Sequence, residues 1–194
     1  WAAWHANINS NLNSVLSMSL GGGASYAEDQ AVEAAHDAGF VVVVAAGNEA
    51  ENACDSSPAR APKAVTVGAT TSSDWMASYS NYGTCVDILA PGSFILSAST
   101  ASNSAQSWSS GTSMATPAVA GAVAQMRARN MQLSSTQATD MLLCLATTGA
   151  LSGISAGTPN KLLYAGHVFS NQFDARAIAC GFSNAQIPPQ PPRP

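Results

Sequence analysis

Residues 14–48 read SVLSMSLGGGASYAEDQAVEAAHDAGFVVVVAAGN, and an apolar run lies at each end of this stretch. The runs 14–23 and 40–48 have the short, uninterrupted apolar character of strands that are buried on both faces of a parallel sheet. Between them, small apolar residues recur at helical spacing, and Gly39 stands where such a helix would end. Strand, helix and strand in this order predict a right-handed crossover unit and therefore an α/β fold.

The rest of the sequence continues to alternate strand and helix patterns. Apolar runs between Pro, Gly, Asn and Ser predict strands over 63–70, 85–92 and 94–100. Small apolar residues at helical spacing predict helices over 112–129 and about 135–147. Ser134 directly precedes the last predicted helix, and Gln137 comes three residues after Ser134, a spacing typical of a capping box. Residues 181–194 read GFSNAQIPPQPPRP, in which most prolines lack the donor that a central strand or a helix needs, so a linker or tail is predicted there.

Composition narrows the class of protein. The chain has 194 residues, of which 46% are hydrophobic, enough for one domain with a sizeable core, and it contains no run of eighteen apolar residues. Only 9% of residues are charged, the net charge is −4 and no basic run is present, so neither nucleic acid nor an anionic membrane is expected as a partner. An even number of cysteines without CxxC spacing disfavours a zinc ribbon and allows two disulfides, among Cys54, Cys85, Cys144 and Cys180.

Two glycine-rich loops follow predicted strands. Because ligands of open α/β sheets bind at the carboxyl ends of the strands, the loops SLGGG (19–23) and AAGN (45–48) should meet at one crevice. Glycine there would let a backbone approach closely, and a peptide could add to such a loop as an extra strand. Asn48 could present its amide to a developing negative oxygen. The alternatives are ordinary tight turns and a turn asparagine.

Ser113 lies in SGTSMATPAVAG (110–121), where a loop is predicted to become a helix. Its hydroxyl and the neighbouring amides would then lie at the positive end of the helix dipole, which suits a nucleophile beside an oxyanion. Pro117 is expected in the first helical turn, where a missing amide hydrogen does no harm. Taken by itself, Ser113 could equally be a helix cap.

In combination, these motifs resemble the subtilisin-like serine proteases (subtilases), and in particular their proteinase K and aqualysin branch. The strings that carry the resemblance are MSLGGG, AAGNEAENACDSSPARAPKAVTVGATTSSD, SNYGTCVDILAPG, SGTSMATP and SGISAGTPNKLLY. They cover about residues 1–166, leaving 167–180 as a C-terminal extension before the proline-rich tail. The resemblance implies a three-layer fold with a mostly parallel central sheet whose N-terminal part is absent, and a chain that begins as a fragment or processed product.

The resemblance also implies roles. Ser113 would be the nucleophile of a secreted endopeptidase that forms an acyl-enzyme, and Asn48 would be the oxyanion-hole side chain. The substrate main chain would bind along the backbone edge formed by Ser19, Leu20 and Gly21. The side chain before the cut would lie against a wall formed by Ala45, Ala46 and Gly47. The implied partners are a polypeptide substrate or an inhibitory propeptide, with the protein itself a monomer. The small wall residues permit a broad or aromatic side-chain preference.

Two departures from the family pattern limit this interpretation. The DTG-type and HGT-type motifs that supply the aspartate and histidine of the triad are absent, and His5, His36 and His167 have no glycine–threonine neighbour. A serine without a base is a poor nucleophile at neutral pH, so the chain alone is predicted to be inactive. Ala118 replaces the histidine of the family's TPHVAG, so the packing behind the nucleophile is expected to differ from that of the family.

The same residues bear on three other classes of function. The missing motifs and Ala118 motivate a non-catalytic protease-like module that still binds peptides. A nucleotide-binding domain is disfavoured because no GxGxxG follows a strand with an acidic residue about twenty positions on, and no Walker lysine is present. A lipase-type esterase is disfavoured because GTSMA lacks the GxSxG elbow.

Family likeness further implies a disulfide and a calcium site. Cysteines in the contexts of Cys54 and Cys85 are bonded to each other in the aqualysin-like branch, which leaves Cys144 and Cys180 as a pair by elimination, with buried free thiols as the alternative. Asp87 stands before an apolar run, where a charge needs a partner. In proteinase K relatives such an aspartate joins two backbone carbonyls in holding structural calcium, which here would be those of Pro62 and Ala64. The alternative for Asp87 is a partly exposed turn cap.

Overall fold

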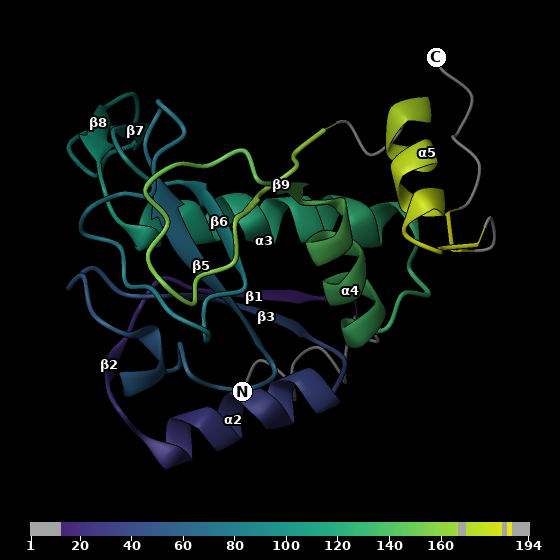
Figure 1. Ribbon diagram of the computed structural model, residues 1–194, viewed down its shortest axis with the longest axis horizontal. Coiled ribbons are helices and arrows are strands. Elements are labelled where there is room, and N and C mark those ends of the chain that lie inside the picture. Colours follow the sequence, from purple (N-terminus) through teal and green to yellow (C-terminus); the bar gives the residue numbers. More distant parts are fainter. Residues whose placement is uncertain (1–12, 167–169, 184–185, 188–194) are drawn as a thin grey trace.

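A central parallel sheet organises the computed structural model, which describes residues 13–166, 170–183 and 186–187 (Figure 1). The sheet has six strands, and neighbours pair in parallel except for the last two. In spatial order the strands are β1 (Val15–Met18), β3 (Val41–Ala45), β5 (Ala64–Thr70), β6 (Ile88–Pro91), β10 (Lys161–Leu162) and β9 (Thr147–Thr148). The predicted α/β class and mostly parallel sheet are confirmed.

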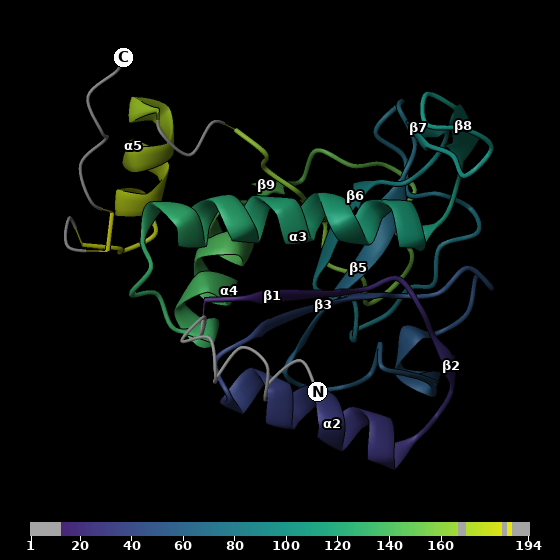
Figure 2. The ribbon, with the colours of Figure 1, turned by 180° about the vertical axis from the view of Figure 1, so that it is seen from behind.

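Helices cover both faces of this sheet, which makes three layers. In Figures 1 and 2, α2 (Tyr26–Asp37) lies on one face of the sheet, and α3 (Thr112–Arg129) and α4 (Ser135–Leu145) lie on the other. The connection from β1 through α2 to β3 is the crossover that residues 14–48 predict.

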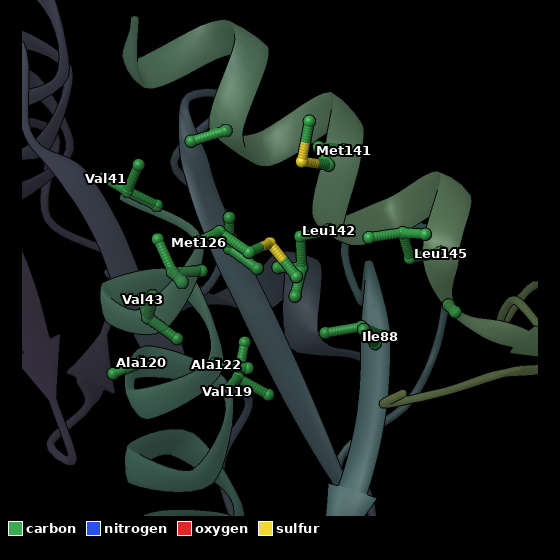
Figure 3. Close-up of a cluster of buried hydrophobic side chains, with 14 of the residues drawn as sticks. Val41, Val43, Ile88, Val119, Ala120, Ala122, Met126, Met141, Leu142 and Leu145 are labelled. Carbon is green, nitrogen blue, oxygen red and sulfur yellow. The ribbon is translucent and has the colours of Figure 1, made fainter. Parts of the chain in front are cut away.

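Strand β3 shows why the sheet is buried on both sides. Every residue of its VVVVA sequence is buried. Val41 and Val43 pack with the side chains of α3 and α4 (Figure 3), whereas Val42 and Val44 pack with Val32 of α2. Because side chains alternate along a strand, only an uninterrupted apolar run can satisfy two helical layers at once.

The helix boundaries follow from local signals. The capping box of α4 is present: the Ser134 hydroxyl accepts from the backbone N–H of Gln137 at 3.1 Å, and the Gln137 side chain accepts from the Ser134 N–H at 3.0 Å. After α2, Gly39 adopts φ +98° and donates its N–H to His36 O, so the predicted end of this helix is confirmed.

Several short elements have no counterpart in the sequence prediction. They include β8 (Gln106–Ser109), the pairing of β2 (Gly22–Gly23) with β4 (Ser56–Ser57), the 3-10 turn η1 (Ala53–Asp55), and α5 (Asn171–Ala179). Strand β8 forms an exposed hairpin with β7 (Ile95–Ala98), which lies within the strand predicted over 94–100. All four residues of β8 are exposed, so it has no apolar periodicity from which it could be predicted. Helix α5 buries Phe173 and Ala177.

Both disulfides are formed, and no cysteine is free. Cys54–Cys85 joins η1 to the segment before β6, with 5.3 Å between the Cα atoms. Cys144–Cys180 joins α4 to the end of α5, with 6.0 Å between the Cα atoms. The second bond ties the C-terminal extension to the sheet domain, and the alternative of free thiols is wrong.

The sequence contains no run of eighteen apolar residues that would predict a membrane-spanning helix. No helix among the described residues is long and apolar enough to cross a bilayer.

The predicted C-terminal tail is described only in part, because residues 184–185 and 188–194 lie outside the described residues. Ile187 is buried in the hydrophobic cluster formed with α3 and α4.

Candidate active site

A cavity of about 510 Å³ opens where β1 and β3 end. This is the edge of a parallel sheet at which ligands of α/β proteins bind. All eight residues for which the sequence predicts a catalytic or substrate-binding role line it: Ser19, Leu20, Gly21, Ala45, Ala46, Gly47, Asn48 and Ser113. Segments separated by up to 94 residues in the chain therefore meet around one hollow.

Ser113 is the second residue of α3, and it is partly accessible at the cavity. The N-cap of α3 is Gly111, which makes no side-chain cap, and the Ser113 Oγ lies 3.5 Å from Ser19 O. The hydroxyl thus faces the segment that follows β1, and the helix-cap alternative for Ser113 is wrong because Gly111 is the N-cap. In the first turn of α3, the backbone N–H of Ser113 has no acceptor within the helix.

The position of Pro117 differs from the prediction. Since α3 begins at Thr112, Pro117 is inside the helix rather than in its first turn, and it cannot donate to the carbonyl of Ser113 four residues earlier. The Ser19 hydroxyl donates to that carbonyl instead, at 2.8 Å. One side chain therefore replaces the missing helical bond and links the segment that follows β1 to α3.

The side chain of Asn48 is oriented by Thr112. Its Oδ1 accepts from the Thr112 backbone N–H at 2.8 Å and from the Thr112 hydroxyl at 3.1 Å. Because a backbone N–H can only donate, the oxygen of the amide must face Thr112. The amide nitrogen of Asn48 then has no acceptor among the described residues, and it remains available to a group bound in the cavity.

Asn81 holds the loop that carries Asn48, and the sequence analysis assigned it no role. Its side chain is buried, accepts from the backbone N–H groups of Glu49 and Glu51 at 3.0 Å each, and donates to Ala46 O at 3.0 Å and to Glu49 Oε2 at 2.9 Å. The same Glu49 oxygen accepts from the Asn48 N–H at 2.8 Å. The string SNYG contains Asn81, but its partners lie 30 to 35 residues away, so no local pattern reveals the contact.

Gly47 packs closely against the Asn81 side chain in this loop. Its φ of +106° lies in the region that favours glycine, and a Cβ there would clash with the Asn81 side chain. The two residues therefore fit together only while position 47 has no side chain.

The other predicted wall residues differ in exposure. Ala45 and Ala46 are buried at the end of β3, whereas Ser19, Leu20 and Gly21 are exposed, with Leu20 52% accessible. The backbone of the latter three is open to pairing with an extended peptide.

The histidines do not supply a base among the described residues. His36 lies on α2, where its Nδ1 is 3.5 Å from Asp37 Oδ1, and it does not line the cavity. His5 and His167 lie outside the described residues. Ala118 is exposed on α3 and lines a separate hollow of about 150 Å³ beside Met126 and Tyr164.

Asp87 immediately precedes β6 and is hydrogen-bonded to Thr66 of β5. Its Oδ2 accepts from the Thr66 backbone N–H at 2.8 Å, and its own N–H donates to Thr66 O. Burial raises the pKa of the Asp87 carboxyl from 3.8 to about 6, although the Thr66 hydrogen bond and the charge of Lys161 lower it. Oδ1 has no partner among the described residues. The described residues contain no cluster of three His, Cys, Asp or Glu side chains that could hold a metal, so any ion here needs backbone carbonyls, such as those of Pro62 and Ala64.

A serine in the first turn of a helix, an anchored asparagine amide and one exposed backbone segment lie around a single cavity, and these are the parts that an acyl-transfer site requires. More narrowly, this chain belongs to the subtilase family, whose model matches residues 1–163. Its fold is that of a subtilisin-like proteinase.

Relatives of known name share half of the aligned residues. Alkaline protease 1 of Aspergillus clavatus is 50% identical over 151 residues, which cover 78% of this chain and 37% of that protein. The extracellular serine proteinase of Thermus sp. (strain Rt41A) is 51% identical over 150 residues, covering 77% of this chain and 37% of that protein. A crystal structure of a cold-adapted subtilisin-like serine proteinase matches with a TM-score of 0.78 and 47% identity, over 84% of this chain and 59% of that one. The chain thus spans well under half the length of these two named relatives.

Proposed function

We propose that these residues form the C-terminal part of the catalytic domain of a secreted serine endopeptidase that is stabilised by calcium. The observation that carries the proposal is the Asn48 side chain, whose oxygen is fixed by Thr112 and whose amide nitrogen is left free in the cavity that Ser113 lines.

The chemistry follows from the atoms at the cavity. The Ser113 Oγ forms a bond to the carbonyl carbon of the substrate, and its proton passes to a base. The carbonyl oxygen becomes an oxyanion, which accepts from the Asn48 amide and the Ser113 N–H. The protonated base then gives its proton to the substrate nitrogen as the carbon–nitrogen bond breaks, which releases the amine and leaves an acyl-enzyme that water then hydrolyses. The base is expected from a family histidine of the HGT type, which this sequence does not contain.

Polypeptide substrates fit the two backbone walls. The exposed segment Ser19–Gly21 can pair with an extended chain, and Ala45–Gly47 can line the space for the side chain that precedes the cut. An inhibitory propeptide would bind by the same edge. Secretion is supported by the likeness to an extracellular serine proteinase of Thermus sp. and by two disulfides, which persist in oxidising compartments.

A non-catalytic peptide-binding module is the second candidate. Two observations favour it: the Ser113 hydroxyl contacts a backbone carbonyl, and no described histidine lines its cavity.

Labelling with a fluorophosphonate separates the two candidates, because this probe reports an activated serine without requiring side-chain recognition. We expect the complete product of the gene to be labelled stoichiometrically at Ser113, and the 194-residue chain to react far more slowly because it lacks a base. Mass spectrometry of the labelled peptide gives the site. A complete product that stays unlabelled would establish the non-catalytic module.

The calcium site gives a separate prediction. Millimolar calcium should raise the melting temperature of the complete gene product, by about 5–10 °C if the ion is present at ~100 times its dissociation constant. Asp87→Asn should lose at least half of this shift, since it removes the only carboxylate proposed as a ligand. Scanning calorimetry with and without a chelator measures it, and Asp140→Asn, an exposed carboxylate on α4, is the matched control. An Asp87→Asn variant that responds to calcium like the wild type would contradict the site.

A further inference from the structure

The cavity that contains Ser113 carries a net negative charge. Three carboxylates line it, those of Glu49, Glu51 and Asp55, and none of its described lining residues is Lys, Arg or His. The volume of about 510 Å³ is within the range of sites that enclose a large side chain. The charge therefore lies in the same hollow as the nucleophile and the oxyanion side chain.

The three carboxylates differ in their partners. Glu49 is neutralised in part, because its Oε2 accepts from the Asn48 N–H and from the Asn81 amide. The carboxylates of Glu51 and Asp55 make no hydrogen bond or ion pair with any described residue. Two negative groups in the cavity are thus left for a ligand.

Nearby cations do not cancel this charge. Arg60 and Lys63 follow the acidic segment in the chain, but Arg60 is paired with Asp29 at 2.7 Å, and Lys63 is paired with Asp37 at 2.6 Å. Both cations are therefore engaged on α2 rather than in the cavity.

The two free carboxylates are also held in place through their backbones. The N–H of Glu51 donates to Asn81, and Asp55 is the last residue of η1, next to the Cys54–Cys85 bond. Their positions relative to Ser113 are fixed by the same hydrogen bonds and disulfide that fix the wall.

We propose that this cavity selects a lysine or arginine at the substrate residue whose carbonyl is attacked, with Glu51 and Asp55 as the residues that determine specificity. This inference rests on the proposed function. The small wall of Ala45, Ala46 and Gly47 accepts the aliphatic stem of a long side chain, and the carboxylates receive its charged end. The small wall residues by themselves would allow an aromatic side chain equally well, and the acidic lining decides between the two.

Both carboxylates are exposed, so water and salt weaken their attraction for a cation. An exposed charge pair changes an equilibrium by up to about fivefold, and two pairs are expected to give a preference of about tenfold. The preference should fall as the ionic strength rises, which a purely steric selection would not do.

The test measures kcat/KM of the complete gene product on four peptide substrates that differ only at the residue before the cut: arginine, lysine, norleucine and phenylalanine. Norleucine matches the stem of lysine without its charge. We expect arginine and lysine to exceed norleucine about tenfold at low ionic strength and about twofold in 1 M salt. Glu51→Gln and Asp55→Asn should each lower the arginine-to-norleucine ratio about threefold, and the double variant should bring it close to one. Asp140→Asn on α4 should leave the ratio unchanged.

The outcomes are distinguishable. An enzyme that is labelled by fluorophosphonate but prefers phenylalanine or norleucine refutes this inference and leaves the proposed function intact. A double variant that is folded by circular dichroism and keeps the full arginine preference refutes it as well. The salt dependence of the wild type tests the charge even if a variant fails to fold. A complete gene product that is neither labelled nor active on any of the four substrates refutes the proposed function and this inference together.

Discussion

Ser113→Ala should lower kcat of the complete gene product by about 10⁶-fold, the loss typical of removing a serine nucleophile from a working triad. The substitution deletes the oxygen that would form the acyl bond. It leaves the Ser113 carbonyl and its bond from the Ser19 hydroxyl in place. Because Ser113 is only partly buried, the melting temperature should change by no more than a few degrees.

Turnover of a chromogenic peptide and fluorophosphonate labelling measure this effect. Ser97→Ala is the matched control, since Ser97 is an exposed serine of β7 that does not line the cavity. Residual activity above about 1% of the wild type would show that another group is the nucleophile. A small residual acceleration over water is expected in any case, since the oxyanion donors and the substrate edge remain.

Asn48→Ala should lower kcat by about 10²–10³-fold with little change in KM, equivalent to ~2.7–4 kcal/mol of transition-state stabilisation. The reason is that the amide would donate to an oxygen that becomes negative only during the reaction. Alanine also removes the acceptor of the Thr112 N–H, so some loss could come from a displaced helix end.

Asn48→Asp separates these two effects. Aspartate keeps an oxygen facing Thr112 but replaces the donor with a negative charge, so the variant should remain folded and lose at least as much activity as alanine. Steady-state kinetics and thermal unfolding on the same preparations give both readouts. An Asn48→Asp enzyme with nearly normal kcat would show that the side chain does not stabilise the oxyanion.

The parts of the fold that the sequence predicts are those whose signal is local. The run VVVVA is buried on both faces as its composition implies, and the Ser134–Gln137 capping box begins α4 as its spacing implies. Strand β8 and the pair of β2 with β4 could not be predicted, because their residues are small or exposed and carry no apolar periodicity.

The site shows the same division. Local sequence identifies Ser113 and Asn48 as candidates, and the structure brings them to one cavity. The bonds that orient them come from Ser19, Asn81 and Thr112, which lie 30 to 94 residues away from their partners. The prediction that Pro117 lies in the first helical turn is wrong for a related reason. Inside α3, Pro117 leaves the Ser113 carbonyl without its helical donor, and the distant Ser19 hydroxyl supplies the donor instead, which no pattern around Pro117 reveals.

The arrangement around Asn81 has a consequence for how the protein can vary. Gly47, Glu49 and Glu51 all depend on the position of one buried amide, and a side chain at position 47 would occupy the space of that amide. Substitutions at these positions should therefore be epistatic: a smaller residue at 81 should reduce the cost of alanine at 47 by removing one clash, while the φ of +106° at position 47 continues to disfavour a side chain. The wall of the cavity is expected to change through paired substitutions and only rarely through single ones.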